Sequence, residues 1–204
     1  MQESATGSPA PIFGHYRTLL HPDGSPFILG NSRDGITYKA IDTRLGRPVG
    51  LKIISRELLW SPEAKQRFLR NARSAASIQH PNIATIFEIG TESDVYYIVT
   101  ELPEGEDLER YVAREGPPWP EVALKVVSQV AQALDGFQAR GLVHGNIKPS
   151  SIIATVDRLG ELRVKLIDFD AVTANGIKRR FSLSARAIDS AICCCSGRYS
   201  NFGC

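Results

Sequence analysis

A glycine-containing segment near the front of the chain, and a lysine that follows it, have the residue types that bind phosphate groups. The segment LGNSRDGITY holds Gly30, Ser32 and Gly35. Small residues let backbone N–H groups approach phosphate oxygens that larger side chains would block, and a serine hinders that approach only slightly. Lys52 ends the run VGLK shortly afterwards. Taken singly, the segment also fits a plain hairpin turn, and a lone strand lysine also fits a solvated surface.

Two later segments carry polar side chains that suit the same chemistry. HGNIKPSS begins at His144 and ends at Ser151, and KLIDFD contains Asp168, whose carboxylate could bind a cation. In order and spacing, the four segments resemble the protein kinase motifs L-G-x-G-x-x-G, V-A-I-K, H-R-D-L-K-P-x-N and D-F-G. The resemblance covers about residues 27–172 and indicates the bacterial type of serine/threonine protein kinase.

The resemblance implies a nucleotide site whose cofactors are ATP and Mg²⁺, bound weakly or not at all. Gly30, Ser32 and Gly35 would cover the phosphates, and Lys52 would pair with them. Asp168 stands where the family binds magnesium, so it is the expected metal ligand.

The segment YIVTELPEG resembles the strand and connector behind which adenine lies in this family. Thr100 would be the gatekeeper, the carbonyl of Glu101 would accept from the adenine amino group, and Leu102 belongs to the same adenine-binding set. Pro103 stands where the family uses a backbone N–H group, which proline lacks. A nucleotide would therefore bind with one connector hydrogen bond missing, at some loss of affinity.

Three substitutions fall on the chemical step that the family performs. Asn146 stands at the position of the catalytic base, and a neutral amide cannot take up the proton; a general base contributes roughly 10²–10⁴-fold. Ser151, a shorter and weaker ligand, replaces the second metal-binding residue, whereas Lys148 is kept. Asn71 replaces the helix glutamate that pairs with the strand lysine, and its amide could accept a hydrogen bond from Lys52 without supplying charge.

The sequence allows a second interpretation of Asn71, and two further substitutions lie near the same motifs. Asn71 could instead be exposed, with Glu63 or Glu101 lying near the lysine. Asp170 replaces the glycine of the D-F-G motif and adds negative charge near the expected metal site. Gly145 removes the arginine that reads a phosphorylated activation loop, so control by loop phosphorylation is not expected.

Together these changes favour a pseudokinase with weak ATP binding and a regulatory or partner-binding role. An alternative is an active or conditional serine/threonine kinase that uses Lys148 and Asp168 without the usual base. A second alternative is a truncated remnant with no stable function. A long amphipathic helix from about Glu121 to Ala139 would normally pack against further helices of the second lobe. Its apolar side is therefore the face where a protein partner is expected.

The residue patterns predict an α+β, protein-kinase-like fold with a β-rich N-lobe containing one helix and an incomplete helical C-lobe. A helix is expected to begin at Ser61-Pro62-Glu63, which has a capping residue, a proline in the first turn and an acid. The same helix would end at His80-Pro81-Asn82. Strands are expected at 27–29, 36–41, 49–54, 83–89, 95–100, 152–156 and 162–167. The predicted divisions are a flexible leader (1–14), the N-lobe (15–102), the partial C-lobe (103–172) and an irregular tail (173–204).

The predicted tail contains all the cysteines of the chain. Three are consecutive, so they fit no usual zinc spacing and are poor disulfide partners for one another; the cysteines are Cys193, Cys194, Cys195 and Cys204. A metal or redox site and a loosely ordered tail are both open. Truncation or a reading-frame change near residue 175 would explain both the tail and the missing helices of the C-lobe.

Composition gives modest limits on partners and location. The 204 residues are 43% hydrophobic and 23% charged, as in ordinary globular proteins, and the formal net charge is +2. This small charge gives no reason to expect nucleic acid or an anionic membrane as a partner. The first residues lack the pattern of a signal peptide, and no apolar run is long enough to span a membrane, so a cytoplasmic location is expected.

Overall fold

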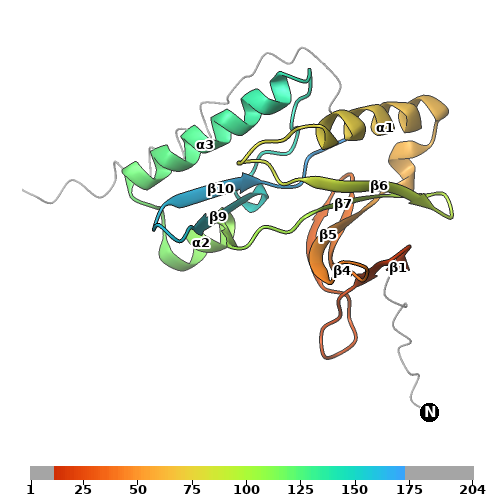
Figure 1. Ribbon diagram of the computed structural model, residues 1–204, viewed down its shortest axis with the longest axis horizontal. Helices are drawn as coiled ribbons and strands as arrows, with labels where there is room; N and C mark the ends of the chain where they lie inside the picture. Colours follow the sequence, from red (N-terminus) through yellow and green to blue (C-terminus); the bar gives the residue numbers. More distant parts are fainter. Residues whose placement is uncertain (1–11, 173–204) are drawn as a thin grey trace, which may run out of the picture.

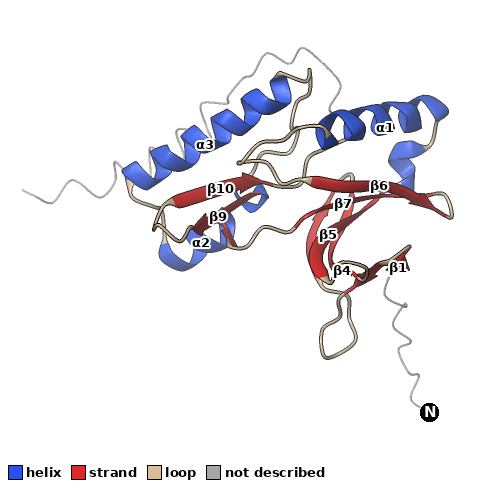
Figure 2. Cartoon of the chain, in the orientation of Figure 1, coloured by secondary structure: helices blue, strands red, loops and turns tan. Residues whose placement is uncertain are grey.

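The computed structural model describes residues 12–172, in which a curled antiparallel sheet is followed by a smaller sheet with helices (Figures 1 and 2). The large sheet has the order β1-β2-β4-β5-β7-β6, and β3 also pairs with β4. Its strands are β1 (Ile12–Phe13), β2 (Tyr16–Thr18), β3 (Ile28–Ser32), β4 (Gly35–Asp42), β5 (Arg47–Ile54), β6 (Ile86–Glu92) and β7 (Val95–Glu101).

Strand β5 is the central strand that positions Lys52. It pairs with β4 on one side and with β7 on the other. Val49 and Leu51 are fully buried and pack on one face of the sheet with Tyr97 and Val99. Because side chains alternate along a strand, Lys52 points to the opposite face of the sheet from Val49 and Leu51.

The single long helix of this lobe, α1 (Pro62–Ala76), follows the short 3₁₀ turn η1 (Arg56–Leu59). The Ser61 side chain accepts a hydrogen bond from the backbone N–H of Ala64, which caps the helix start as the sequence indicates. Phe68 and Ala72 are fully buried in a core that the helix shares with the sheet.

The second lobe is built around a long helix and a β-hairpin (Figure 1). The buried side of α3 packs on β10, and Val126, Ala133 and Phe137 share a core with Val164 and Leu166. The elements of this lobe are β8 (Glu106–Asp107), α2 (Leu108–Glu115), α3 (Pro120–Gln138), η2 (Pro149–Ser151), β9 (Ile152–Val156) and β10 (Leu162–Leu166).

Asn82, in the loop between α1 and β6, ties the two lobes together. Its side-chain amide is buried and donates to Gln129 Oε1 at 2.9 Å and to the carbonyl oxygen of Val164 at 2.8 Å. Its own carbonyl accepts from the backbone N–H of Leu166 at 2.8 Å. These bonds fix the end of β10, and therefore the segment that begins at Asp168, relative to the first lobe.

The α+β fold with a β-rich first lobe and a partial second lobe confirms the sequence prediction. Several elements differ from it. β2 was not predicted, and the strand expected at 83–89 is observed as β6 at Ile86–Glu92. β1 lies inside the segment expected as a flexible leader, because residues 12 and 13 pair with 17 and 16. β8 and α2 were missed, although the Asp107 side chain caps α2 by accepting from the Arg110 N–H group. The predicted tail at 173–204, with its cysteines, lies outside the described residues.

Within the described residues, no helix has both the length and the apolar character needed to cross a membrane.

Candidate nucleotide-binding site

Lys52 lies at the centre of the site, buried between two carboxylates. Only 5% of the residue is exposed, and Nζ donates to Asp34 Oδ2 at 2.7 Å and to Asp168 Oδ1 at 2.6 Å. Burial alone would lower the pKa of Lys52, but the carboxylates of Asp168 and Asp34 outweigh it and raise the pKa above its ordinary value. The lysine is therefore charged, with two of its three donor positions in use.

Asn71 does not take part in this cluster. It is only 3% exposed, and its side-chain amide donates to the carbonyl oxygen of Ala171 at 3.0 Å. The amide thus anchors the segment after Asp168 to α1. Both sequence hypotheses for Asn71, an acceptor for Lys52 or an exposed residue, are wrong. The side chain of Glu101, considered as a substitute partner, pairs with Lys165 instead, at 2.6 Å.

Asn146, at the position expected for the catalytic base, acts as a hydrogen-bond donor to Asp168. Its Nδ2 lies 2.6 Å from Asp168 Oδ2 and 3.3 Å from the Asp168 carbonyl oxygen. Lys148 Nζ lies 3.9 Å from the same Oδ2 atom, so the loop supplies both an amide and a positive charge to this carboxylate. Asp168 itself has a left-handed backbone, with φ of 64°, which turns the chain sharply at the site.

Ser151 is held inside its own turn. Its Oγ donates to the Lys148 carbonyl oxygen at 2.8 Å and accepts from the Lys148 backbone N–H at 3.0 Å, and the residue is fully buried. These bonds use its proton and one lone pair, and they stabilise the 3₁₀ turn η2 that carries Lys148.

Asp168 is the one carboxylate that the predicted metal ligands offer to a magnesium ion. Each carboxylate oxygen of Asp168 already accepts a hydrogen bond, Oδ1 from Lys52 and Oδ2 from Asn146. Ser151 has engaged its hydroxyl elsewhere. Among residues 12–172, no group of three or more His, Cys, Asp or Glu side chains is arranged to hold a metal. In nucleotide sites Mg²⁺ is usually held by one or two carboxylates together with waters and phosphate oxygens, so Asp168 would hold the ion without a second ligand from Ser151.

Asp170 contacts both the β3–β4 hairpin (the glycine-rich hairpin) and the HGNIKPSS loop. Its backbone N–H donates to the His144 carbonyl oxygen at 3.0 Å, and its Oδ1 accepts from the Val172 N–H at 3.0 Å. Its Oδ2 lies 3.9 Å from Arg33 Nη2 in the hairpin turn. The extra carboxylate that the sequence placed near the metal site therefore caps its own turn.

Three aromatic rings that pack on one another support the site. Phe169 stacks on Phe137 of α3 with ring centroids 5.1 Å apart, and the His144 ring meets Phe137 edge-on at 5.1 Å. His144 is only 1% exposed, and this burial lowers the pKa of its imidazole to about 4. At neutral pH the ring is therefore uncharged; it packs against Phe137 and Phe169, and its Nδ1 accepts a hydrogen bond from the Asn146 backbone N–H at 3.4 Å.

The depressed pKa of His144 predicts a loss of stability in mild acid. His144 takes up a proton at its ordinary pKa of 6.5 in the unfolded chain and only at about 4 in the folded chain. The stability that depends on neutral His144 is therefore fully present above pH 6.5 and is lost as the pH falls to 4. The shift corresponds to about 3 kcal/mol. Urea unfolding at a series of pH values should show this fall in the natural protein and not in His144→Leu. Equal pH profiles in the two proteins would contradict the assignment, and exposed His21→Gln serves as the control.

Thr100 and Glu101, two of the residues expected at the adenine site, lie at the end of β7. Thr100 lies on β7 opposite Gly50, and a Cβ at Gly50 would come within 2.8 Å of Thr100 Oγ1. The missing side chain at Gly50 therefore makes room for the Thr100 hydroxyl. The Glu101 side chain turns towards Lys165, and its backbone N–H donates to the Thr85 carbonyl oxygen at 2.8 Å.

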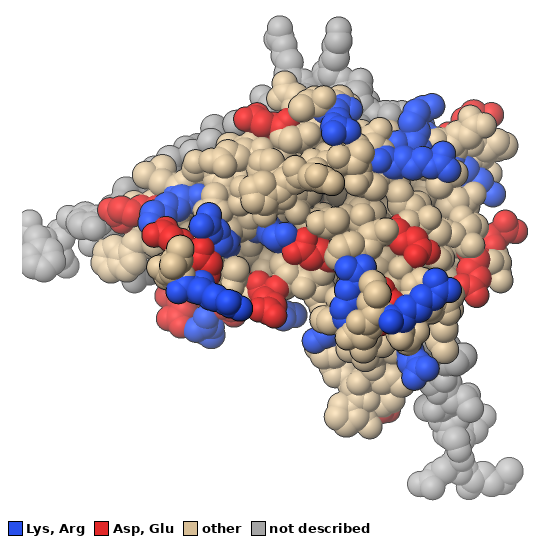
Figure 3. Space-filling view, in the orientation of Figure 1, with Lys and Arg blue, Asp and Glu red and all other residues tan. Residues whose placement is uncertain are grey.

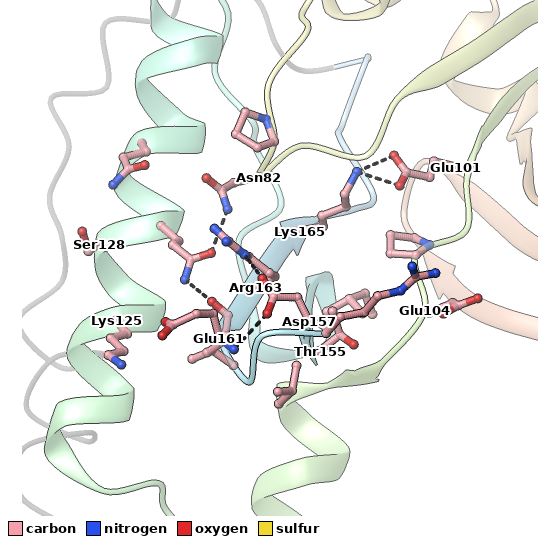
Figure 4. Close-up of a pocket in the computed structure, with 18 of the residues that line it drawn as sticks. Asn82, Glu101, Glu104, Lys125, Ser128, Thr155, Asp157, Glu161, Arg163 and Lys165 are labelled. Atoms are coloured by element: carbon pink, nitrogen blue, oxygen red, sulfur yellow. Dashed lines mark hydrogen bonds and ion pairs between the residues drawn. The ribbon is translucent and has the colours of Figure 1, made fainter.

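A cavity of about 930 Å³ lies apart from this site, between α3, the β9–β10 hairpin and the connector (Figure 4). Its lining mixes charges of both signs, several already paired: Glu101 with Lys165, and Asp157 with Arg163. The face drawn in Figure 3 likewise shows positive and negative side chains interspersed. Lys52, Asn146 and Asp168 are not among the described residues that line this cavity.

The first lobe is a curled sheet with one packed helix, and a connector joins it to a second lobe. The second lobe presents a loop and an aspartate to a lysine on a buried strand. This is the arrangement of a protein kinase-like domain. Comparison with known proteins agrees with it. The family model described as "Protein kinase domain" matches residues 27–187, and the chain belongs to this family. Its sequence relatives are serine/threonine kinases of the bacterial type.

Serine/threonine-protein kinase PrkC of Bacillus subtilis is 37% identical over 163 residues, covering 80% of this chain and 24% of that protein. Serine/threonine-protein kinase PknE of Mycobacterium tuberculosis is 33% identical over 162 residues, covering 79% of this chain and 27% of that protein. The chain thus spans about a quarter of the length of these curated relatives. The crystal structure of the Mycobacterium tuberculosis PknI kinase domain matches with a TM-score of 0.64 and 26% identity, covering 83% of this chain and 64% of that one.

The structure brings four of the predicted site residues together and adds one that was missed. Lys52, Asn146 and Lys148 each lie within hydrogen-bond or ion-pair distance of Asp168. Asp34 was not predicted, yet it is a direct partner of Lys52. The pairing of β4 with β5 explains this contact. Thr37 on β4 lies opposite Lys52 on β5, so the turn between β3 and β4, which carries Asp34, lies close to the lysine.

Proposed function

We propose that this chain is a pseudokinase domain that binds an adenine nucleotide weakly, transfers phosphate poorly or not at all, and acts by binding a protein partner. The single observation that carries the proposal is the hydrogen bond from Asn146 to Asp168. A catalytic base must present a lone pair to the substrate hydroxyl. The N–H₂ group of Asn146 is directed at Asp168 instead, with 2.6 Å between Nδ2 and Oδ2.

The electrostatics of the site support weak nucleotide binding. Lys52 keeps one free donor for a phosphate oxygen, because Asp34 and Asp168 use the other two. Asp168 accepts one hydrogen bond at each carboxylate oxygen and keeps a second lone pair on each, so Lys52 and Asn146 compete with a metal ion for its negative charge without blocking it. We therefore infer that nucleotide binding depends little on Mg²⁺. A cytoplasmic location, where ATP is available, belongs to the same proposal.

The partner-binding part of the proposal is supported by the exposed side of α3. Leu124 and Val127 on this helix are 69% and 64% exposed, and Trp119 just before it is 73% exposed. Large apolar side chains that gather on one face commonly mark an interaction surface. The charge of the whole chain, +2, supports a protein rather than nucleic acid or a membrane as that partner.

The proposal predicts nucleotide protection without phosphate transfer. ATP should raise the unfolding temperature by a small amount, nearly equal with Mg²⁺ and with a chelator. Transfer of radiolabelled phosphate to casein or to the chain itself should not exceed that of a control with both Asp34→Asn and Lys52→Met. This double variant removes the lysine and one partner carboxylate together, so the charge of the buried cluster is unchanged.

Two results would argue against this function. Transfer clearly above the double variant would favour the conditional kinase, in which Lys148 and Asp168 act without a base. The absence of any shift with ATP, ADP or adenosine would remove nucleotide binding from the proposal. A cooperative unfolding transition of the natural protein would separate a folded domain from a remnant with no stable structure.

A further inference from the structure

The tip of the glycine-rich hairpin places a carboxylate directly on the lysine that would bind phosphate. Arg33 and Asp34 form the two-residue turn between β3 and β4. Asp34 is only 4% exposed, and its Oδ2 lies 2.7 Å from Lys52 Nζ. A buried ammonium group needs a countercharge, and α1 carries the neutral Asn71 where a carboxylate would serve. The hairpin supplies that charge.

The hairpin holds Asp34 in this position by several bonds. Ser32 Oγ donates to Asp34 Oδ1 at 2.6 Å, and the Ser55 backbone N–H donates to the Asp34 carbonyl oxygen at 3.0 Å. At Gly35, which has φ of 150°, a Cβ would come within 1.9 Å of the Ile53 carbonyl oxygen. The turn is therefore packed closely against β5, and the contact with Lys52 follows from the hairpin geometry.

A carboxylate in this place competes with phosphate. In a kinase-like site the phosphates lie between the glycine-rich turn and the strand lysine. Asp34 comes from that turn, so its carboxylate occupies the side of Lys52 that faces the turn. It uses a donor that phosphate would use, and its negative charge repels the phosphate charge in a site largely shielded from water. A helix carboxylate would pair with the lysine from another direction and leave that side open.

We propose that Asp34 is an intramolecular competitor of nucleotide phosphates at Lys52, so that the glycine-rich hairpin inhibits its own ligand site. The inference rests on the proposed nucleotide-binding function and gives a cause for its weakness. In this state the site favours an uncharged adenine ligand such as adenosine over ATP. Phosphate-bearing ligands bind only after the Asp34–Lys52 ion pair opens.

The test compares the natural protein with Asp34→Asn by titration calorimetry, using ATP, adenosine and tripolyphosphate as separate probes. Asparagine has the same shape and still accepts the Ser32 hydrogen bond, but it carries no charge. We expect ATP and tripolyphosphate to bind about tenfold more tightly to the variant, because a like charge has left the site. Adenosine, which carries no phosphate, should bind equally to both proteins.

Two further variants make the comparison specific. Ser32→Ala removes the hydroxyl that holds Asp34 and keeps its charge, so phosphate affinity should rise by a smaller factor, roughly twofold to threefold. Asp94→Asn makes the same charge change in the exposed turn between β6 and β7 and should leave all three affinities unchanged. Thermal unfolding curves establish that each variant is folded.

The outcomes separate this inference from the proposed function. Equal or weaker binding of ATP and tripolyphosphate by Asp34→Asn would overturn the competitor role and assign Asp34 to holding Lys52 in place. If adenosine and ATP bind to neither protein, the nucleotide-binding function fails. In that event a gain for tripolyphosphate in the variant still supports the role of Asp34, and no gain overturns it.

Discussion

Replacing Lys52 with methionine should lower the free energy of unfolding by about 3–5 kcal/mol, the cost of leaving a buried ion-pair partner without its countercharge. Lys52 is the group that neutralises Asp34 and Asp168, and both carboxylates stay close together once it is gone. Asp34 has only 6% of its side chain exposed, so water screens it poorly. Urea unfolding followed by circular dichroism measures the change.

The matched control is the double variant Asp34→Asn with Lys52→Met. It removes one positive and one negative charge from the cluster, so it should recover most of the stability that Lys52→Met loses. A double-mutant cycle then gives the coupling between Lys52 and Asp34 directly. If Lys52→Met and the double variant are equally unstable, the ion pair is not what holds the cluster together.

Replacing Phe137 with alanine should cost about 3–5 kcal/mol and also loosen the nucleotide site. Phe137 is 2% exposed, and its ring stacks on Phe169 and meets His144 edge-on. The cavity left behind would remove the ring that Phe169 rests on. Because Phe169 directly follows Asp168, the carboxylate should lose its fixed position, and the affinity for ATP should fall together with the stability.

Phe137→Leu keeps most of the apolar volume and loses the stacking, so its cost should be smaller, about 1–1.5 kcal/mol. Denaturant unfolding of both variants measures the two costs. A loss below about 1 kcal/mol for Phe137→Ala would show that the aromatic cluster does not support the site.

Much of the fold could be predicted from the sequence because its signals are local. The cap Ser61 and the adjacent Pro62 mark the start of α1, and alternating apolar residues mark β4 and β5. The strands that were missed are short. β1 and β8 have two residues each and β2 has three, and their pairing depends on where the chain returns. A strand of that length has no periodicity to detect.

In the candidate site, too, some properties could be predicted from the sequence and others depended on the fold. The loss of a proton acceptor at Asn146 is a property of the residue type, and it can be stated without coordinates. The direction of its amide, towards Asp168, depends on how the loop approaches β10. For Asn71 the sequence allowed either a hydrogen bond with Lys52 or exposure to solvent, whereas the structure buries the residue with its amide donating to the Ala171 carbonyl oxygen.

The sequence by itself determined the family, the order of the motifs and the chemical groups that are missing, because these are fixed by residue identity and spacing along the chain. Only the tertiary structure decided which charge pairs with Lys52. Its partners lie 18 and 116 positions away, and they meet because a hairpin turn and a loop after β10 converge on one strand. A buried charge takes the nearest available countercharge, and in this protein the glycine-rich hairpin itself provides it.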